Sequence, residues 1–279
     1  MPLEISLNGR VVLVTGGSRG IGAATVRALR DAGARVAFSY RRERERAETL
    51  AASCGGPSQC LALAQELSSV DDGQALVASA LAHFGRLDAL VVNHGIWPAH
   101  DQPITTMRAA QWRQTLGVNL DSVFGLVQAA TAAMLAQPQP PAGPLVSAPS
   151  SAPAPLQRHG VRGHIVLVAS TAAQRGEAFH ADYAASKGAL LSLTKSLSSE
   201  LAPQGILCNC VAPGWVRTEM SAATLDDPVA SKKALALIPL GRAAEPEEIA
   251  GPIAFLLSEW AGFVSGEVFN VNGGAVLAG

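Results

Sequence analysis

Apolar segments typical of strands alternate with helix-like segments along nearly the whole chain, and this alternation constrains the fold more than any other feature. Continuous apolar strands separated by helices are typical of a parallel sheet covered by helices on both faces. We therefore predict an α/β fold: a doubly wound parallel sheet of the Rossmann type, in three layers and one domain. The expected strands lie near residues 10–15, 35–39, 60–64, 87–92, 163–169, 205–211 and 267–271, and the expected helices near 20–32, 42–54, 71–84, 108–116, 118–136, 182–202 and 246–258.

Length and composition agree with a single domain over residues 1–279. Hydrophobic residues make up 48% of the chain and charged residues 15%, which is enough to bury a large core. The net charge of -1 gives no reason to expect a nucleic-acid or membrane partner. The N-terminus does not resemble a signal peptide, and no apolar run is expected to reach the roughly 18 residues of a membrane span. We expect a cytoplasmic protein. The four cysteines are not grouped as metal ligands, so no metal site is predicted.

Residues 137–162 interrupt the alternation. They contain seven of the 17 prolines, separated mainly by alanine and serine, and this composition builds neither helix nor strand. We predict a loop insertion before the fifth strand, at the edge of the sheet opposite the ligand site. It is interpreted as a tolerated surface insertion, with a partner-docking loop as the alternative.

A glycine-rich turn follows the first predicted strand and opens the first predicted helix. Residues 15–22 read TGGSRGIG, with glycines at 16, 17, 20 and 22. In this position the N–H groups and the dipole of the helix N-terminus face the pyrophosphate of a dinucleotide. The turn therefore predicts a dinucleotide site, although a glycine-rich turn without a ligand would look similar.

The end of the second predicted strand favours NADP(H) over NAD(H). An NAD site usually has an acidic residue there for the ribose 2′-hydroxyl. This chain has Ser39, Tyr40, Arg41 and Arg42 instead, and Arg19 of the glycine turn can approach the same point. Guanidinium groups suit a 2′-phosphate, which a carboxylate would repel. The alternative, a solvated helix start, accounts for the later arginines of the RRERER run but not for the missing acid.

Tyr183 and Lys187 lie one turn apart on a predicted helix and so share a face. A free phenol has a pKa of about 10, and a neighbouring ammonium group is expected to lower that pKa. This would make the tyrosine a usable proton donor or acceptor. Ser170, at the end of the fifth predicted strand, can hydrogen-bond the substrate oxygen.

Together these motifs resemble the short-chain dehydrogenase/reductase family, in its shorter single-domain branch and near its 3-oxoacyl-ACP reductase-like members. The resemblance covers nearly the whole chain except the insertion. It is carried by TGGSRGIG, by VNHG at 92–95, by Asn119 in GVNLDSVF, by Ser170 with YAASK at 183–187, by PGWVRTEM at 213–220 and by GEVFNVNGG at 266–274.

The resemblance implies roles for these residues. Tyr183 would be the acid or base, Lys187 would lower its pKa and bind the nicotinamide ribose, and Ser170 would polarise the carbonyl. Asn119 would hold a water that links Lys187 to solvent. The residues expected to bind the cofactor are Gly16, Ser18, Arg19, Gly20, Ile21, Gly22, Tyr40, Arg41, Arg42, Glu66, Leu67, Asn93, Gly95, Tyr183, Lys187, Pro213, Gly214, Val216 and Thr218.

Two positions depart from the family pattern. His94 stands where the family usually has Asn or Ala, and is interpreted as part of the wall beside the cofactor, with substrate contact as the alternative. Glu66 stands where an aspartate usually contacts adenine. Trp97, His180 and Trp215 are candidates to border the substrate or, alternatively, to pack within the fold.

The resemblance implies an oxidoreductase that transfers hydride between NADP(H) and a small-molecule carbonyl or alcohol. A 3-oxoacyl-thioester reductase is one assignment, and a sugar, steroid or xenobiotic carbonyl reductase is another. The alternative class is a non-catalytic dinucleotide sensor or scaffold of the same fold. The resemblance also implies a homotetramer or homodimer, and residues 217–242 are expected to form a lid over the substrate.

Overall fold

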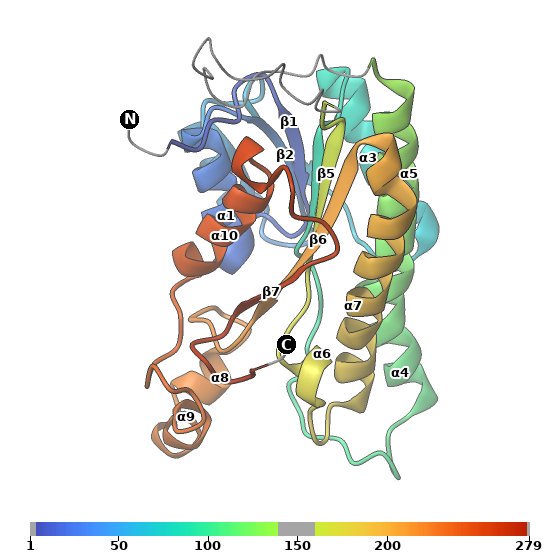
Figure 1. Cartoon of the computed structure of the whole chain (residues 1–279). Helices are drawn as coiled ribbons and strands as arrows, with labels where there is room; N and C mark the ends of the chain where they lie inside the picture. The colour runs from blue at the N-terminus through green and yellow to red at the C-terminus, as the bar shows by residue number, and fades with distance from the viewer. Residues whose placement is uncertain (1–3, 139–159, 278–279) are drawn as a thin grey trace, which may run out of the picture.

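The computed structural model describes residues 4–138 and 160–277, and its centre is one parallel sheet (Figure 1). The seven strands have the order β3-β2-β1-β4-β5-β6-β7, and every neighbouring pair is parallel. Their bounds are Val11–Val14 (β1), Arg35–Tyr40 (β2), Cys60–Ala64 (β3), Ala89–Val92 (β4), Gly163–Val168 (β5), Ile206–Pro213 (β6) and Val268–Val271 (β7).

Helices cover both faces of the sheet, which confirms the predicted doubly wound, three-layer fold. Helices α1 and α10 pack together on one face, and α3, α5 and α7 cover the other (Figure 1). The helices are α1 (Gly20–Asp31), α2 (Arg44–Ser53), α3 (Val70–Phe84), α4 (Ala109–Leu116), α5 (Ser122–Ala136), α6 (Ala172–Arg175), α7 (Ala181–Leu201), α8 (Ala222–Leu225), α9 (Pro228–Leu235) and α10 (Pro246–Leu256).

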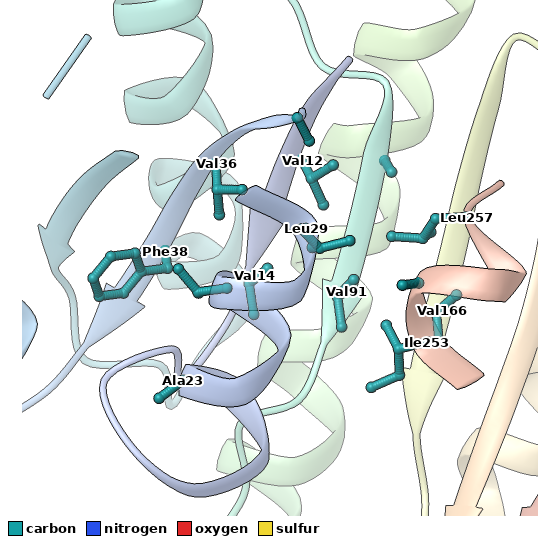
Figure 2. Close-up of a cluster of buried hydrophobic side chains, with 14 of the residues drawn as sticks. Val12, Val14, Ala23, Leu29, Val36, Phe38, Val91, Val166, Ile253 and Leu257 are labelled. Carbon is teal, nitrogen blue, oxygen red and sulfur yellow. The ribbon is translucent and has the colours of Figure 1, made fainter. Parts of the chain in front are cut away.

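Each face of the sheet has its own hydrophobic core, because successive strand residues point to opposite faces. Along β1, Val12 and Val14 point to the face covered by α1 and α10, where they pack with Leu29 and Ile253 (Figure 2). Their neighbours in β1 point into the other core, beneath α3 and α5. Burial on both faces explains why the strands are continuous apolar runs in the sequence.

Two segments differ in detail from the sequence prediction. The helix expected over 118–136 begins with a π-helical turn, Gly117–Asp121, that joins α4 to α5 without a break. The expected lid, 217–242, contains the short helices α8 and α9, which the sequence pattern did not indicate. Most of the predicted insertion, residues 139–159, lies outside the described residues.

The helical run Ala109–Ala136 is long and apolar enough to cross a membrane by length and composition alone, contrary to the expectation from sequence. Half of its most apolar window is buried inside this fold. Its α5 part packs against α3, and its α4 part against α7. The apolar side chains of this run therefore contribute to the core of the α/β fold.

Candidate active site

A cleft lies at the carboxyl edge of the sheet, where the strand order reverses between β1 and β4. Ligands of open α/β sheets bind at such a switch point. The cleft has a volume of about 440 Å³. It is lined by most of the residues predicted from sequence: Gly16, Ser18, Arg19, Gly20, Ile21, Tyr40, Arg41, Arg42, Leu67, Asn93, Gly95, Ser170, Tyr183, Lys187, Pro213, Gly214, Val216 and Thr218.

The glycine turn has the geometry that a dinucleotide pyrophosphate requires. Gly16 and Gly20 adopt positive φ angles of 65° and 50°, which favour glycine. A Cβ at Gly22 would collide with the Gly16 carbonyl oxygen, so this glycine lies beneath the cleft and sets the tightness of the turn. Within the described chain, Arg19 is the N-cap of α1 and its side chain makes no capping hydrogen bond. The N-terminus of α1 can therefore receive a phosphate.

Three arginines gather at the adenosine end of the cleft. Arg19 comes from the glycine turn, and Arg41 and Arg42 follow β2; all three line the cleft with exposed side chains. Arg41 also approaches Glu66, with Nη1 and Oε1 3.7 Å apart. Such an exposed pair is weak, so Arg41 can exchange this contact for a phosphate.

Glu66 does not line the cleft, unlike its neighbours Gln65 and Leu67. Backbone that continues from β3 in extended form alternates its side chains, so 65 and 67 face the cleft and 66 faces away. The Gln65 N–H donates to the Tyr40 carbonyl at 2.9 Å, which fixes this alternation. Glu66 therefore borders the cleft through Arg41 only, and its contact with adenine stays a prediction. Gln65 lines the cleft but was not singled out; its position two residues before Leu67 was the only signal in the sequence.

Ser170, Tyr183 and Lys187 converge at the other end of the cleft. Helix α7 carries Tyr183 and Lys187, and Ser170 follows β5. The Ser170 hydroxyl group lies close enough to the Tyr183 phenol to act on its pKa. The Lys187 ammonium is almost fully buried and donates to the Val168 carbonyl at 2.8 Å. A carbonyl oxygen beside Ser170 and Tyr183 would meet two hydroxyl groups.

The pKa of Tyr183 is shifted in the direction opposite to the sequence prediction. Burial raises it to about 12 and outweighs the opposing effect of the Ser170 hydroxyl group, while the charge of Glu177 raises it further. Burial also lowers the pKa of Lys187 to about 8, so its ammonium group loses a proton more readily than it would in water. Tyr183 is consequently protonated at neutral pH, the form that donates a proton to a carbonyl oxygen.

Asn119 is buried beneath the cleft and does not line it. Its Oδ1 accepts from the Ile96 N–H at 2.8 Å, and its Nδ2 donates to the Ile96 carbonyl and to Ser186 Oγ, both at 3.0 Å. A Cβ placed on Gly95 would lie 3.2 Å from Asn119 Oδ1 and 3.3 Å from Lys187 Nζ. Asn119, which belongs to the π-helical turn, therefore lies close to Lys187. Its hydrogen bonds to Ile96 fix the loop that follows β4.

His94 is part of the cleft wall, as the sequence interpretation favoured. Its Nδ1 lies 2.7 Å from Thr15 Oγ1, and its Nε2 lies 2.8 Å from Ser122 Oγ and 3.0 Å from the Val118 carbonyl. Burial, followed by the charge of Lys187, lowers its pKa to about 3. The neutral ring thus joins the end of β1 to the π-helical turn.

The end of the cleft beyond Tyr183 is aromatic and charged. Trp97 and Trp215 both line it, with ring centroids 6.5 Å apart and planes at 82°. His180 lies behind Trp97 and stacks on it at 4.6 Å. Arg175 and Glu177 also line this end but were not singled out from sequence. Their location between Ser170 and Tyr183 was the signal that could have found them.

Comparison with known proteins agrees with this geometry. The model of the short chain dehydrogenase family matches residues 10–228. The chain belongs to that family. A 3-oxoacyl-[acyl-carrier-protein] reductase of Synechocystis is 32% identical over 98% of this chain and 99% of that protein. An L-rhamnose 1-dehydrogenase (NAD(P)(+)) of Azotobacter vinelandii is 35% identical over 95% and 96%. A blue fluorescent protein from a metagenomic library, solved with NADPH, superposes with a TM-score of 0.82 at 32% identity, over 98% and 100%.

His94→Ala is expected to lower the free energy of unfolding by about 2 kcal/mol, because it leaves buried polar groups without partners. Its partner Thr15 directly follows β1, and its partner Ser122 is the first residue of α5. Chemical denaturation at pH 7 measures the change. The control, His83→Ala, removes an exposed ring and should change the free energy by less than about 0.5 kcal/mol. Equal effects of the two variants would contradict the bridging role of His94.

The same variant should alter the pH dependence of stability. The pKa of His94 is about 3 in the folded protein, below the ordinary value of 6.5. Between these values the unfolded chain binds a proton that the folded protein excludes, so stability falls as the pH drops below 6.5. Denaturation curves between pH 7 and 5 should therefore show a shallower pH slope for His94→Ala than for the wild type.

Proposed function

We propose that this protein is an NADP(H)-dependent oxidoreductase that interconverts a small-molecule ketone and a secondary alcohol. The observation that carries the proposal is the meeting of Ser170, Tyr183 and Lys187 in one cleft with the glycine turn. The family supports the hydride-transfer chemistry, and the placement of the acid–base groups beside the cofactor turn supports catalysis over a purely sensing role.

When bound, NADPH supplies the hydride, which passes to the carbonyl carbon. Ser170 and Tyr183 hold the carbonyl oxygen, and Tyr183 donates its phenolic proton to that oxygen as the negative charge develops. Lys187 stabilises the phenolate that remains, and a proton from solvent restores the phenol. In the reverse direction the Tyr183 phenolate would accept the proton of the alcohol, and the bound cofactor would supply the hydride acceptor.

The preference for NADP(H) is supported by Arg19, Arg41 and Arg42 at the adenosine end of the cleft. The structure of the related blue fluorescent protein was solved in complex with NADPH. NAD(H) is the less favoured cofactor, because β2 ends in Ser39 and Tyr40 and is followed by Arg41 and Arg42, not by the acidic residue that usually binds a ribose 2′-hydroxyl at the end of this strand. The other residues predicted to bind the cofactor would hold its pyrophosphate and its nicotinamide riboside.

We further propose a cytoplasmic homotetramer or homodimer with residues 217–242 as the substrate lid and the insertion on the surface. The resemblance to the family supports this assembly, and Phe124 of α5 is half exposed in the single chain. Size-exclusion chromatography with light scattering tests the assembly.

A ketone panel assayed with NADPH and NADH in parallel tests the function. We expect oxidation of NADPH with at least one ketone and a higher kcat/KM with NADPH than with NADH. NADPH binding without turnover of any ketone or alcohol would instead support the sensor.

A further inference from the structure

The substrate end of the cleft combines aromatic surface with charge. We call Trp97, Arg175, Glu177 and Trp215 the substrate corner; all four line the cleft. The two indole rings stand almost perpendicular, at 82°. A carboxylate and a guanidinium from the segment between Ser170 and Tyr183 lie at the same end. This corner therefore offers two apolar ring surfaces nearly at right angles, a hydrogen-bond acceptor and a hydrogen-bond donor.

Glu177 lies close to the reacting centre. Its charge raises the pKa of the Tyr183 phenol, and its own half-buried carboxyl group lies near the Trp97 side chain, which acts to lower the pKa of that carboxyl group. A carboxylate has about four acceptor sites, so one nearby indole leaves capacity for further donors. A ligand with hydroxyl groups at this point would donate hydrogen bonds to the Glu177 carboxylate and so replace those of the water that it displaces.

Trp97 is held in place from behind. His180 is only 3% exposed, stacks on the indole at 15° between planes, and its Nε2 lies 2.9 Å from the Pro98 carbonyl oxygen. A fixed indole presents apolar area at low cost in conformational entropy, and the C–H faces of a carbon skeleton pack well against it.

We propose that the substrate is a compact polyhydroxylated ketone or the corresponding polyol or sugar. Glu177 accepts hydrogen bonds from its hydroxyl groups, Arg175 donates to its oxygens, and Trp97 and Trp215 pack against its carbon face. The inference rests on the proposed hydride-transfer function and specifies the substrate class of the same site.

An apolar acyl chain fits the substrate corner less well. It would remove water from Glu177 and Arg175 without replacing the lost hydrogen bonds, which is costly for charged groups.

The experiment compares ketones that share a carbon skeleton but differ in hydroxyl groups. Erythrulose and 2-butanone form one pair, ketohexoses and 2-hexanone another, and acetoacetyl-CoA represents the acyl thioesters; polyols with NADP⁺ cover the reverse reaction. We expect the kcat/KM of at least one hydroxylated ketone to exceed that of its plain partner by about 10²-fold or more, because a site built around substrate hydroxyl groups rejects analogues that lack them.

Variants at Glu177 connect this preference to the substrate corner. Glu177→Leu should lower the hydroxylated-to-plain ratio of kcat/KM at least about tenfold, mainly through KM. Glu177→Gln, which keeps hydrogen-bonding atoms, should restore part of the ratio. The control Asp101→Asn removes a nearby exposed carboxylate, beside His180 and outside the cleft, and should leave the ratio unchanged. A merely structural role of Glu177 would lower both kcat/KM values together.

The outcomes separate this inference from the function on which it rests. Turnover of 2-butanone, 2-hexanone or acetoacetyl-CoA in preference to every hydroxylated compound would overturn the polyol assignment and leave the hydride-transfer function standing. An unchanged ratio in Glu177→Leu would overturn the role of Glu177. NADPH binding with no turnover of any compound would overturn the proposed function itself.

Discussion

Tyr183→Phe is expected to reduce kcat by about 10³-fold while NADPH binds with nearly the wild-type Kd. The substitution removes only the phenolic oxygen, so the ring still fills its place on α7 and the cleft keeps its shape. What is lost is the proton donated to the substrate oxygen and one of the two hydroxyl groups that hold this oxygen beside Ser170. Steady-state kinetics with NADPH and a turned-over ketone measure kcat, and quenching of protein fluorescence by NADPH measures Kd.

A fall in kcat alone would not prove acid–base catalysis, so a second variant provides the contrast. Ser170→Ala removes the other hydroxyl group but leaves a proton donor in the site, and its kcat should fall less than that of Tyr183→Phe. A kcat for Tyr183→Phe within tenfold of the wild type would contradict the assignment of Tyr183 as the proton donor.

The pKa values explain why this result could not be read from spacing alone. The one-turn spacing of Tyr183 and Lys187 correctly predicts that both side chains reach the same cleft. It does not predict how deeply they are buried, and burial decides the sign of the shift: it raises the pKa of the phenol and lowers that of the ammonium. The phenol is thus ready to donate its proton near neutral pH, and the role of Lys187 begins when the phenolate forms.

The fold was predictable for a different reason. The inner strands are buried on both faces, which explains their continuous apolar runs, whereas the edge strands β3 and β7 are only partly buried. The expected strands match those observed to within two residues. The π-helical turn Gly117–Asp121 was not predictable in this way, since the apolar pattern of one helix continues through it. At this turn Asn119 makes tertiary hydrogen bonds with Ile96 and Ser186, and such contacts between distant residues cannot be read from the apolar pattern.

The substrate end was the least predictable part of the site. A glycine turn or a Tyr-x-x-x-Lys spacing indicates a specific chemistry, whereas Arg175 and Glu177 resemble surface charges in the sequence. The end of α6 brings Arg175 into the cleft, and the loop after α6 brings Glu177 there. At the adenosine end, Gln65 and Leu67 line the cleft and Glu66 does not, because extended backbone alternates its side chains.

Arg41→Ala combined with Arg42→Ala is expected to lower the preference for NADPH over NADH by about 10²-fold. Each guanidinium can donate charge-assisted hydrogen bonds to the 2′-phosphate, and one such bond at an exposed site is worth about tenfold in affinity. NADH has no 2′-phosphate, so its kcat/KM should change little. The ratio of kcat/KM for the two cofactors, measured at fixed ketone concentration, reports the preference, and raising the salt concentration should narrow the gap between wild type and variant.

Arg44→Ala is the matched control, because it removes an arginine from the same basic run without touching the cleft. Arg44 is the first residue of α2 and pairs with Glu48, with Nε and Oε1 2.7 Å apart, and it does not line the cleft. Its loss should leave the cofactor ratio at the wild-type value. If Arg44→Ala lowered the ratio as much as the double variant, the preference would come from the general positive charge of residues 41–46. An equal loss of NADPH and NADH activity in the double variant would mean that these arginines do not distinguish the two cofactors, and Arg19 would remain as the phosphate-binding candidate.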